Sequence, residues 1–293
     1  MAHKAGFVNI LGYPNVGKST LMNALVGEKL SIITSKAQTT RQRIMGIVNG
    51  EDFQIVYSDT PGIVRSPAYK MHELMNKYID TALIDADIIL LMTEPGIKFQ
   101  EEAILQRLKE GSVPVIVLIN KIDLSNQTAI EEEISYWYKL LPDAEVIPVS
   151  ALERFNINKV FDLILDKLPE SPPYYDKDEF TDKSMRFFVS EIIREKILLN
   201  YRKEIPYEAE VAVESYKEDE KLVRISALIF TGRESQKAII LGHQGKAIKK
   251  MASEARKDIE DFIGKKVFLE TTVKVKKDWR DNENMLKHFG YDH

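Results

Sequence analysis

The sequence contains no cysteine, which excludes disulfide bonds and thiolate metal sites. Only five histidines occur in the chain, and they are scattered without the spacing of a metal site. No segment approaches about 18 consecutive apolar residues, so we expect no transmembrane helix. Residues 1–6 run directly into a strand-like segment and leave no room for a signal peptide. Together these absences favour a cytoplasmic protein.

Length and charge indicate two domains of different character. A chain of 293 residues exceeds the usual size of a single domain. Its composition, 44% apolar and 29% charged, is typical of a soluble globular protein. The net charge of −4 combines −7 in residues 1–180 with +3 in residues 181–293. The mildly basic C-terminal part is compatible with an anionic partner.

A phosphate-binding motif occupies residues 12–19, where GYPNVGKS matches G-x-x-x-x-G-K-[ST]. It stands between a predicted buried strand at residues 7–11 and a predicted helix at residues 19–26. Backbone N–H groups in such a turn, beside the positive end of a helix dipole, bind phosphate. Lys18 is predicted to reach the β- and γ-phosphates, and the Ser19 hydroxyl to ligate Mg²⁺. The predicted loop residues are Gly12, Tyr13, Pro14, Asn15, Val16, Gly17, Lys18, Ser19 and Thr20.

The rest of the first half alternates between apolar strands and amphipathic helices. Asn49-Gly50 is a strong hairpin signal because both residues tolerate positive φ, so it predicts an antiparallel pair of strands at residues 43–48 and 53–58. Further strands are predicted at residues 88–92, 115–119 and 146–148, and helices at 69–84, 99–109, 128–140 and 156–168. This alternation predicts a mostly parallel sheet covered on both faces, with its ligand at the carboxyl ends of the strands.

The predicted strand at residues 53–58 ends in Asp59-Thr60-Pro61-Gly62. A carboxylate at this place can hold Mg²⁺ through a water molecule, and the backbone N–H of Gly62 can meet a γ-phosphate. Hydrolysis would remove that contact and free the segment that follows. We therefore assign Asp59, Thr60, Pro61 and Gly62 to the nucleotide site.

A base-recognition motif, Asn120-Lys121-Ile122-Asp123, follows the predicted strand at residues 115–119. The Asp123 carboxylate can accept two hydrogen bonds from the N1–H and the exocyclic amine of guanine, whereas adenine presents no such pair of donors. The Asn120 side chain can tie neighbouring loops together, and the aliphatic stem of Lys121 can cover the base. These residues predict a preference for guanine.

The segment Ser150-Ala151-Leu152 follows the next strand, where Ser150 and Ala151 could offer backbone donors to the guanine carbonyl. In order along the chain, GYPNVGKS, Thr39-Thr40-Arg41, DTPG, NKID and SAL resemble the translation-factor-related class of small GTPases. The resemblance implies a Ras-like α/β fold with a mostly parallel sheet and one antiparallel edge strand.

This resemblance also implies roles for particular residues. A switch threonine of this class ligates Mg²⁺ when GTP is bound; we choose Thr40, with Thr39 as the alternative. The predicted metal ligands are then Ser19, Thr40 and, through water, Asp59. The predicted catalytic residues are Lys18, Thr40 and Gly62.

Two positions bear on the rate of hydrolysis. Ile63 stands where Ras-like enzymes often carry a water-orienting glutamine, and an aliphatic side chain cannot orient water, so we expect slow intrinsic turnover. In related GTPases with asparagine at the position of Asn15, K⁺ supplies the charge that an arginine finger supplies elsewhere, and we hypothesise the same here. Arg41 and Arg43 are expected to be solvated or to face RNA, and we give them no catalytic role.

Residues 169–178 carry three prolines among polar and charged residues, which predicts a semi-extended linker. We place the nucleotide domain at residues 1–170, the linker at 171–182, a second domain at 183–280 and a tail at 281–293. The second domain reads α-β-β-α-α-β, with elements predicted at residues 184–199, 208–216, 222–230, 236–241, 246–263 and 267–276. The polar tail is expected to be mobile.

Two helices joined by Gly242-His243-Gln244-Gly245 form the core of a type II KH module, an α+β RNA-binding fold. Glycines permit a close approach of a nucleic-acid backbone, and the helix ends offer N–H groups to phosphates. The predicted RNA-binding residues are Gly242, His243, Gln244, Gly245, Lys246, Lys249 and Lys250. Trp279 either stacks on a base or caps the core of the domain.

A GTPase domain, a proline-containing linker and a KH-like domain in this order closely resemble the Era family of bacterial GTPases. The resemblance implies a GTP-hydrolysing switch that binds 16S rRNA near its 3′ end and assists assembly of the 30S subunit. It also implies GTP and GDP as ligands, Mg²⁺ as cofactor with K⁺ as a second candidate, and a cytoplasmic monomer with possible peripheral association at the inner membrane. The alternatives are a GTPase acting on protein or membrane partners through the KH-like domain, and a constitutive RNA-binding protein with a vestigial nucleotide site.

Overall fold

The computed structural model describes residues 2–291. The chain divides into two compact units, which are described separately. The first comprises residues 1–31, 40–66 and 75–182, and the second comprises residues 32–39, 67–74 and 183–293. Two short segments of the N-terminal half therefore group with the C-terminal unit. The domain boundaries at residues 170 and 183 stay a prediction from the sequence.

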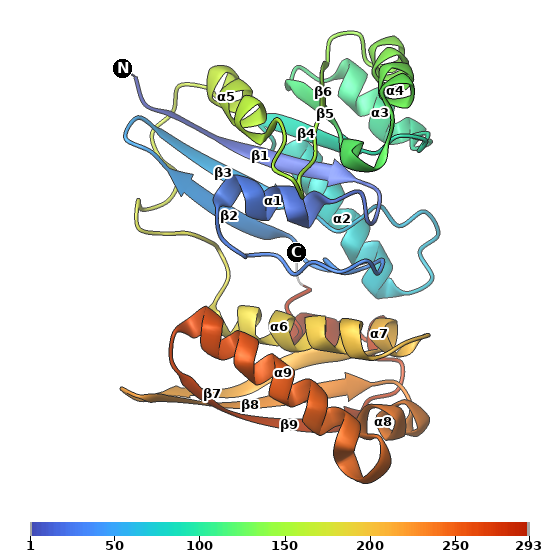
Figure 1. The fold of residues 1–293 in the computed structure, drawn as a ribbon, viewed down its shortest axis with the longest axis vertical. Coiled ribbons are helices and arrows are strands. Elements are labelled where there is room, and N and C mark those ends of the chain that lie inside the picture. Colours follow the sequence, from blue (N-terminus) through green and yellow to red (C-terminus); the bar gives the residue numbers. More distant parts are fainter. Residues whose placement is uncertain (1, 292–293) are drawn as a thin grey trace. The chain divides into compact units, whose positions relative to one another are not determined.

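A six-stranded sheet forms the centre of the first unit (Figure 1). Its strands lie in the order β2-β3-β1-β4-β5-β6, and only the pair β2 and β3 is antiparallel. The central strands bury nearly every side chain, as apolar strands covered on both faces must. The strands are β1 (Lys4–Gly12), β2 (Ile44–Asn49), β3 (Phe53–Asp59), β4 (Ile88–Thr93), β5 (Val115–Ile119) and β6 (Glu145–Pro148).

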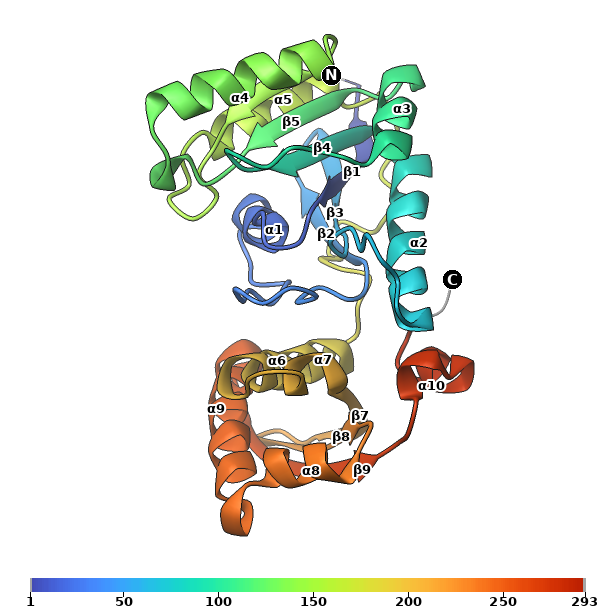
Figure 2. The ribbon, with the colours of Figure 1, turned by 90° about the vertical axis from the view of Figure 1, so that its right-hand side faces the viewer.

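Helices cover both faces of this sheet. Figure 2 shows α1 on one face and α2 and α3 on the other, and an Arg107–Asp80 ion pair joins α2 to α3. The helices are α1 (Lys18–Val26), α2 (Lys70–Ile84), α3 (Glu102–Glu110), α4 (Gln127–Leu140) and α5 (Ile157–Lys167). This arrangement confirms the predicted α/β fold with one antiparallel edge strand.

The linker follows the edge of this sheet in an extended conformation. Phe180 accepts a backbone hydrogen bond from Ile47 of β2 at 2.9 Å, and the Thr181 hydroxyl donates to the Met45 carbonyl at 2.6 Å. Gln54 of β3 binds the backbone of Tyr175 through its side-chain amide. The segment therefore satisfies backbone groups that an open edge strand would otherwise expose.

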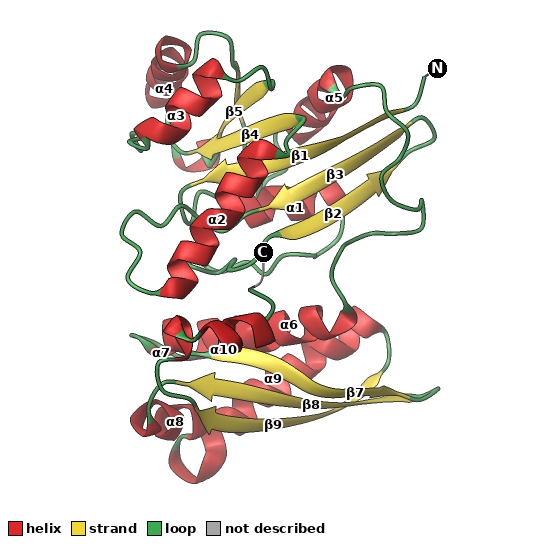
Figure 3. Cartoon of the chain, turned by 180° about the vertical axis from the view of Figure 1, so that it is seen from behind, coloured by secondary structure: helices red, strands yellow, loops and turns green. Residues whose placement is uncertain are grey.

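The second unit contains a three-stranded sheet of β7 (Glu210–Glu218), β8 (Leu222–Thr231) and β9 (Lys266–Val275), shown in yellow in Figure 3. The strands β7 and β8 are antiparallel, whereas β8 and β9 are parallel. The helices are α6 (Met185–Asn200), α7 (Ile205–Glu208), α8 (Glu234–Leu241) and α9 (Lys246–Ile263). The predicted order α-β-β-α-α-β is confirmed, and the four-residue α7 is the one addition within it.

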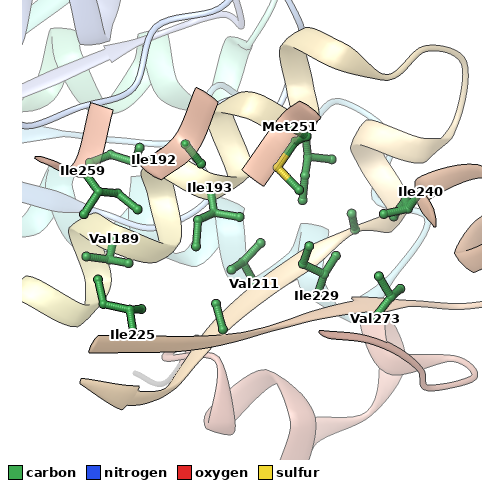
Figure 4. Close-up of a cluster of buried hydrophobic side chains, with 14 of the residues drawn as sticks. Val189, Ile192, Ile193, Val211, Ile225, Ile229, Ile240, Met251, Ile259 and Val273 are labelled. Carbon is green, nitrogen blue, oxygen red and sulfur yellow. The ribbon is translucent and has the colours of Figure 1, made fainter. Parts of the chain in front are cut away.

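The core of this unit lies between one face of the sheet and the helices α6 and α9 (Figure 4). Ile193 of α6 and Met251 of α9 are fully buried and face Val211 and Ile229 of the sheet. The α9 sequence repeats its buried positions at Met251, Ala255 and Ile259, which is the spacing of one helix face. Ile240 of α8 is buried in the same cluster, so this packing holds both helices that flank the turn between α8 and α9.

The expected mobility of residues 281–293 is wrong for the part of the tail that the structure describes. The helix α10 (Glu283–His288) follows Asn282, whose side chain accepts a hydrogen bond from the Met285 N–H. Tyr291 is buried, and its hydroxyl donates to Glu210 at 2.7 Å. Trp279 is also buried and stacks edge-on against Phe289, so it belongs to the core rather than to an RNA surface. Residues 292 and 293 lie outside the described part of the chain.

Candidate functional sites

The phosphate-binding turn between β1 and α1 is closely packed. Gly12 has φ 149°, and a Cβ there would lie 2.3 Å from the Met92 carbonyl oxygen. Gly17 has φ 99°, and a Cβ there would lie 2.3 Å from the Asn120 Nδ2 atom. Asn15 also has positive φ and is exposed. Only glycine fits at both ends of this turn.

Lys18, the first residue of α1, turns its buried side chain back into the turn. Its Nζ atom donates to the carbonyl oxygens of Gly12 at 3.1 Å and Tyr13 at 2.8 Å. Burial lowers the pKa of Lys18 to about 8, and the charge of Asp59 opposes this shift. Anionic phosphate oxygens at the turn would favour the charged ammonium, so the lysine suits this ligand.

Three predicted ligands of Mg²⁺ converge beside this lysine. The Ser19 hydroxyl donates to Asp59 Oδ2 at 2.7 Å and lies 2.8 Å from the Thr40 hydroxyl. The Thr40 hydroxyl also donates to Asp59 Oδ2, at 3.2 Å. Asp59 Oδ1 is buried without a hydrogen-bond partner, and burial raises the pKa of this carboxyl. Hard oxygen donors and an orphaned carboxylate oxygen fit Mg²⁺.

The two adjacent switch threonines face different partners. Thr40 reaches Ser19 and Asp59, as described above. The Thr39 hydroxyl instead lies 2.6 Å from the Thr34 hydroxyl and donates to the Lys36 carbonyl at 2.6 Å. Of the two candidates, Thr40 has the position that a metal ligand requires.

The Asp-Thr-Pro-Gly segment lies directly against the phosphate-binding turn. A Cβ on Gly62 would come within 2.8 Å of Pro14, and the Ile63 N–H points to the Gly12 carbonyl at 3.4 Å. Thr60 is different, because its buried hydroxyl donates to the Ile10 carbonyl at 2.7 Å. Thr60 therefore anchors this segment to β1, while Gly62 stands at the mouth of the turn.

The NKID motif joins the turn to a further loop through Asn120. Its Nδ2 atom donates to the Val16 carbonyl at 2.8 Å, and its Oδ1 atom accepts from the Ala151 N–H at 2.9 Å. Lys121 has φ 61° and pairs with Glu94. Asp123 lies in a short 3-10 helix with an exposed side chain. The asparagine thus holds two loops in place, and the aspartate is accessible to a base.

The Ser-Ala-Leu segment differs from expectation in its backbone donors. The Ser150 N–H donates to the Phe155 carbonyl at 3.3 Å, and the Ala151 N–H is taken by Asn120. Neither donor points to a ligand here, because each closes a loop contact within the protein. The Leu152 side chain is exposed. Sequence alone could not show this, since a backbone N–H has no sequence signature.

The expectation that Arg41 and Arg43 are solvated or face RNA is wrong, because both are buried. Arg43 donates through Nε to Ser58 at 2.6 Å and through both terminal nitrogens to Asp85, at 2.5 and 3.0 Å. Asn9, within β1, accepts from Arg43 at 3.0 Å and donates to Asp85 at 2.7 Å. Asn9 is a polar residue among the apolar residues of strand β1, and this feature of the sequence could have indicated a buried polar network.

The turn between α8 and α9 has the Gly-x-x-G geometry that the sequence predicts. Gly242 has φ 68°, and a Cβ there would lie 2.6 Å from the Ala247 Cβ atom. Gly245 has φ 73°, but nothing lies within 4 Å of a Cβ at that position. His243 and Gln244 are exposed between them. The first glycine is required by packing and conformation, and the second by conformation alone.

Exposed cations follow this turn along the first part of α9. Lys246, Lys249 and Lys250 are all exposed, and only Lys250 has an acidic neighbour within salt-bridge distance, Glu254 at 3.8 Å. The N-terminus of α9 adds the positive end of a helix dipole beside these side chains. The arrangement offers a positive surface to an anionic polymer.

Comparison with known proteins identifies the two units. A family model described as 50S ribosome-binding GTPase matches residues 7–121, and a KH domain model matches residues 204–280. GTPase Era of Clostridium kluyveri is 43% identical over 98% of this chain and 99% of that protein. The chain belongs to the Era family of GTPases. The resemblance to Era that the motifs predicted is thereby confirmed.

Solved Era structures match the chain along nearly its whole length. Era in complex with MgGDPNP and nucleotides 1506–1542 of 16S ribosomal RNA has a TM-score of 0.94 at 37% identity, over 99% of this chain and 100% of that one. A variant of Aquifex aeolicus Era bound to GDP·AlF4− gives the same values. The fold prediction of a Ras-like domain followed by a KH domain is confirmed. No helix among residues 2–291 is long and apolar enough to span a membrane.

Proposed function

We propose that this Era-family protein is a switch that binds and hydrolyses GTP with Mg²⁺, binds 16S rRNA near its 3′ end and assists assembly of the 30S subunit. The observation that carries this proposal is the convergence of Ser19, Thr40 and Asp59 beside the buried Lys18. The RNA part is supported by the solved Era complex with 16S rRNA nucleotides and by the exposed lysines of α9.

Each residue of the nucleotide site has a role in this proposal. Lys18 exchanges its two carbonyl partners for β- and γ-phosphate oxygens, since these carry the greater negative charge. Ser19 and Thr40 hold Mg²⁺ directly and Asp59 holds it through water, and the ion supplies positive charge to the phosphates during hydrolysis. The Gly62 N–H contacts the γ-phosphate.

Loss of the γ-phosphate acts on both switch segments at once. Thr40 ends a loop that precedes β2, and Gly62 follows β3 and lies against Pro14 of the phosphate-binding turn. When hydrolysis removes their shared ligand, both segments lose a contact and can adopt another arrangement. RNA affinity that depends on the bound nucleotide is the expected outcome of such a switch.

Binding of an RNA with the sequence of nucleotides 1506–1542 of 16S rRNA tests this proposal. The RNA affinity is measured by fluorescence anisotropy with a GTP analogue, with GDP and without nucleotide. We expect the tightest binding with the GTP analogue. Equal binding in all three states would support a constitutive RNA-binding protein, and no binding in any state would support a GTPase that acts on protein or membrane partners.

Gly242→Asp assigns the RNA contact to the α8–α9 turn. The change adds a negative charge at the phosphate-facing loop and should lower RNA affinity by at least about tenfold. Gly264→Asp is the control for the added charge at a positive φ, because Gly264 has φ 73°, against 68° at Gly242, and lies at the opposite end of α9. Gly242→Ala is the control for the Cβ contact with Ala247, because it adds no charge. Equal losses in Gly242→Asp and in either control would reject this placement.

Asn15 supports a further proposal, that K⁺ accelerates hydrolysis. Its side chain is exposed at the phosphate-binding turn, where the bound phosphates are expected. We expect hydrolysis to be about tenfold faster in K⁺ than in Na⁺, because a cation there stabilises charge that develops in the transition state. Asn15→Ala should remove the difference, and equal rates in the two salts with the unaltered protein would contradict the proposal.

The proposed location is the cytoplasm, with peripheral association at the inner membrane as the finer hypothesis. This location rests on the resemblance to Era and on the absence of cysteine from the sequence. Flotation of the purified protein with vesicles of anionic phospholipid tests the membrane part. Protein that stays at the bottom of the gradient would contradict it.

A further inference from the structure

The segment that follows Gly62 is attached to the phosphate-binding turn by side chains as well as by backbone. Arg65 extends over the aromatic ring of Tyr13, with its guanidinium carbon 4.4 Å from the ring centroid. Its Nε atom donates to Glu101 at 3.0 Å. Tyr13 belongs to the GYPNVGKS motif, so Arg65 connects the segment that follows DTPG to the phosphate-binding turn and to Glu101.

Glu101 and Tyr13 are themselves fixed in place. The Tyr13 hydroxyl donates to the same Glu101 oxygen at 3.1 Å and accepts from the Gln100 N–H at 2.9 Å. The Tyr13 ring is 7% exposed and packs against Phe99, with ring centroids 5.1 Å apart. The arginine therefore meets a rigid platform rather than two mobile side chains.

We propose that Arg65, Tyr13 and Glu101 form a clasp that holds residues 62–65 on the phosphate-binding turn and so sets the rate of GTP hydrolysis. Arg65 is a positioning residue in this proposal, because it acts through the placement of the Gly62 N–H. The inference rests on the proposed function of the nucleotide site.

The geometry gives the clasp two connections to the reacting groups. The Tyr13 carbonyl accepts a hydrogen bond from Lys18, and Pro14 lies against Gly62. The contacts with the Tyr13 hydroxyl and with Glu101 raise the pKa of Arg65, so the arginine stays charged at every physiological pH.

The test is steady-state hydrolysis by the full chain, with kcat and KM measured separately. We expect Arg65→Ala to lower kcat by about tenfold and to change KM less than twofold, because the guanine-binding loops are untouched. Glu101→Ala should lower kcat by about fivefold, and the double variant should be no slower than Arg65→Ala, because both changes open one clasp.

Arg107→Ala is the matched control, since Arg107 forms a comparable exposed ion pair with Asp80 in the same unit. Its kcat should stay within about twofold of the unaltered protein. The proposal is overturned if Arg65→Ala matches this control, if the two clasp changes multiply, or if Glu101→Ala speeds hydrolysis by freeing the arginine. Absence of hydrolysis in the unaltered protein would instead overturn the proposed function.

Discussion

The chain contains two glycine-bounded turns that each lead into a helix, and they differ in how tightly the protein surrounds them. At the phosphate-binding turn, a Cβ on Gly12 or Gly17 would lie 2.3 Å from neighbouring atoms, and the first lysine of the helix is buried. At the Gly-x-x-G turn, a Cβ on Gly242 would meet Ala247 at 2.6 Å, but Gly245 is open and the lysines that follow are exposed. A closed turn selects one small ligand by shape, whereas an open turn holds a polymer mainly by charge.

The largest expected effect comes from adding one methyl group to the closed turn. Gly17→Ala places a Cβ against Asn120 and forces φ 99° on an alanine, so we expect the affinity for GDP to fall at least about 100-fold. Titration with a fluorescent GDP derivative measures this loss. Gly27→Ala at the other end of α1 is the control, because Gly27 has φ 85° and open space. Equal losses of GDP affinity in the two variants would mean that the strain of a positive φ, and not the contact with Asn120, causes the effect.

Asp123→Asn tests how the nucleotide site selects guanine. Replacing the carboxylate by an amide removes the acceptor for two guanine donors, so GTP affinity should fall about 100-fold. Xanthosine triphosphate, which presents a carbonyl in place of the exocyclic amine, should bind the variant more tightly than GTP does. Glu132→Gln, an exposed carboxylate on α4, should leave both affinities unchanged. Unaltered GTP binding by the Asp123 variant would place base recognition elsewhere.

Reversing the charge of two lysines tests whether the Gly-x-x-G turn holds RNA mainly by charge. Lys249→Glu combined with Lys250→Glu should weaken RNA binding about 30-fold and lower the salt dependence by about two counterions. The basal hydrolysis rate without RNA should not change. Lys221→Glu, in the turn between β7 and β8, is an exposed cation away from the α8–α9 turn and serves as control. An equal loss of RNA affinity in Lys221→Glu would show that the net charge of the second unit, and not the α8–α9 turn, determines RNA binding.

The smallest expected effect is that of Gly245→Ala. The left-handed φ of 73° costs an alanine about 1 kcal/mol, and no neighbouring atom adds a clash. We therefore expect a fall of a few degrees in the melting temperature, measured by calorimetry, and RNA affinity within about threefold. A loss of RNA affinity as large as the loss of GDP affinity in Gly17→Ala would show that the Gly-x-x-G turn tolerates a side chain no better than the phosphate-binding turn does.

The sequence predicted the fold and the positions of the nucleotide motifs because these depend on local patterns. Apolar strands and amphipathic helices have their own periodicity, and the motifs stand at the ends of strands. The choice between Thr39 and Thr40 had no such basis, since a loop of irregular backbone decides which hydroxyl reaches Asp59. Likewise, the polar composition of the tail concealed the buried Tyr291.

The burial of Arg43 shows why some site residues escape prediction. Its partner Asp85 lies 42 residues away in sequence, and Ser58 and Asn9 come from two further strands. Only the folded sheet brings the four together. An arginine near a threonine-rich loop is equally compatible with solvent exposure when the sequence is considered alone.

This network makes Asn9, Arg43 and Asp85 a set rather than three independent positions. The planar guanidinium bonds two atoms of one carboxylate and a side-chain amide, a pattern that lysine cannot reproduce. During divergence, loss of any one member would leave a buried polar group without its partner. Across relatives of this chain, we therefore expect the three positions to change together or not at all.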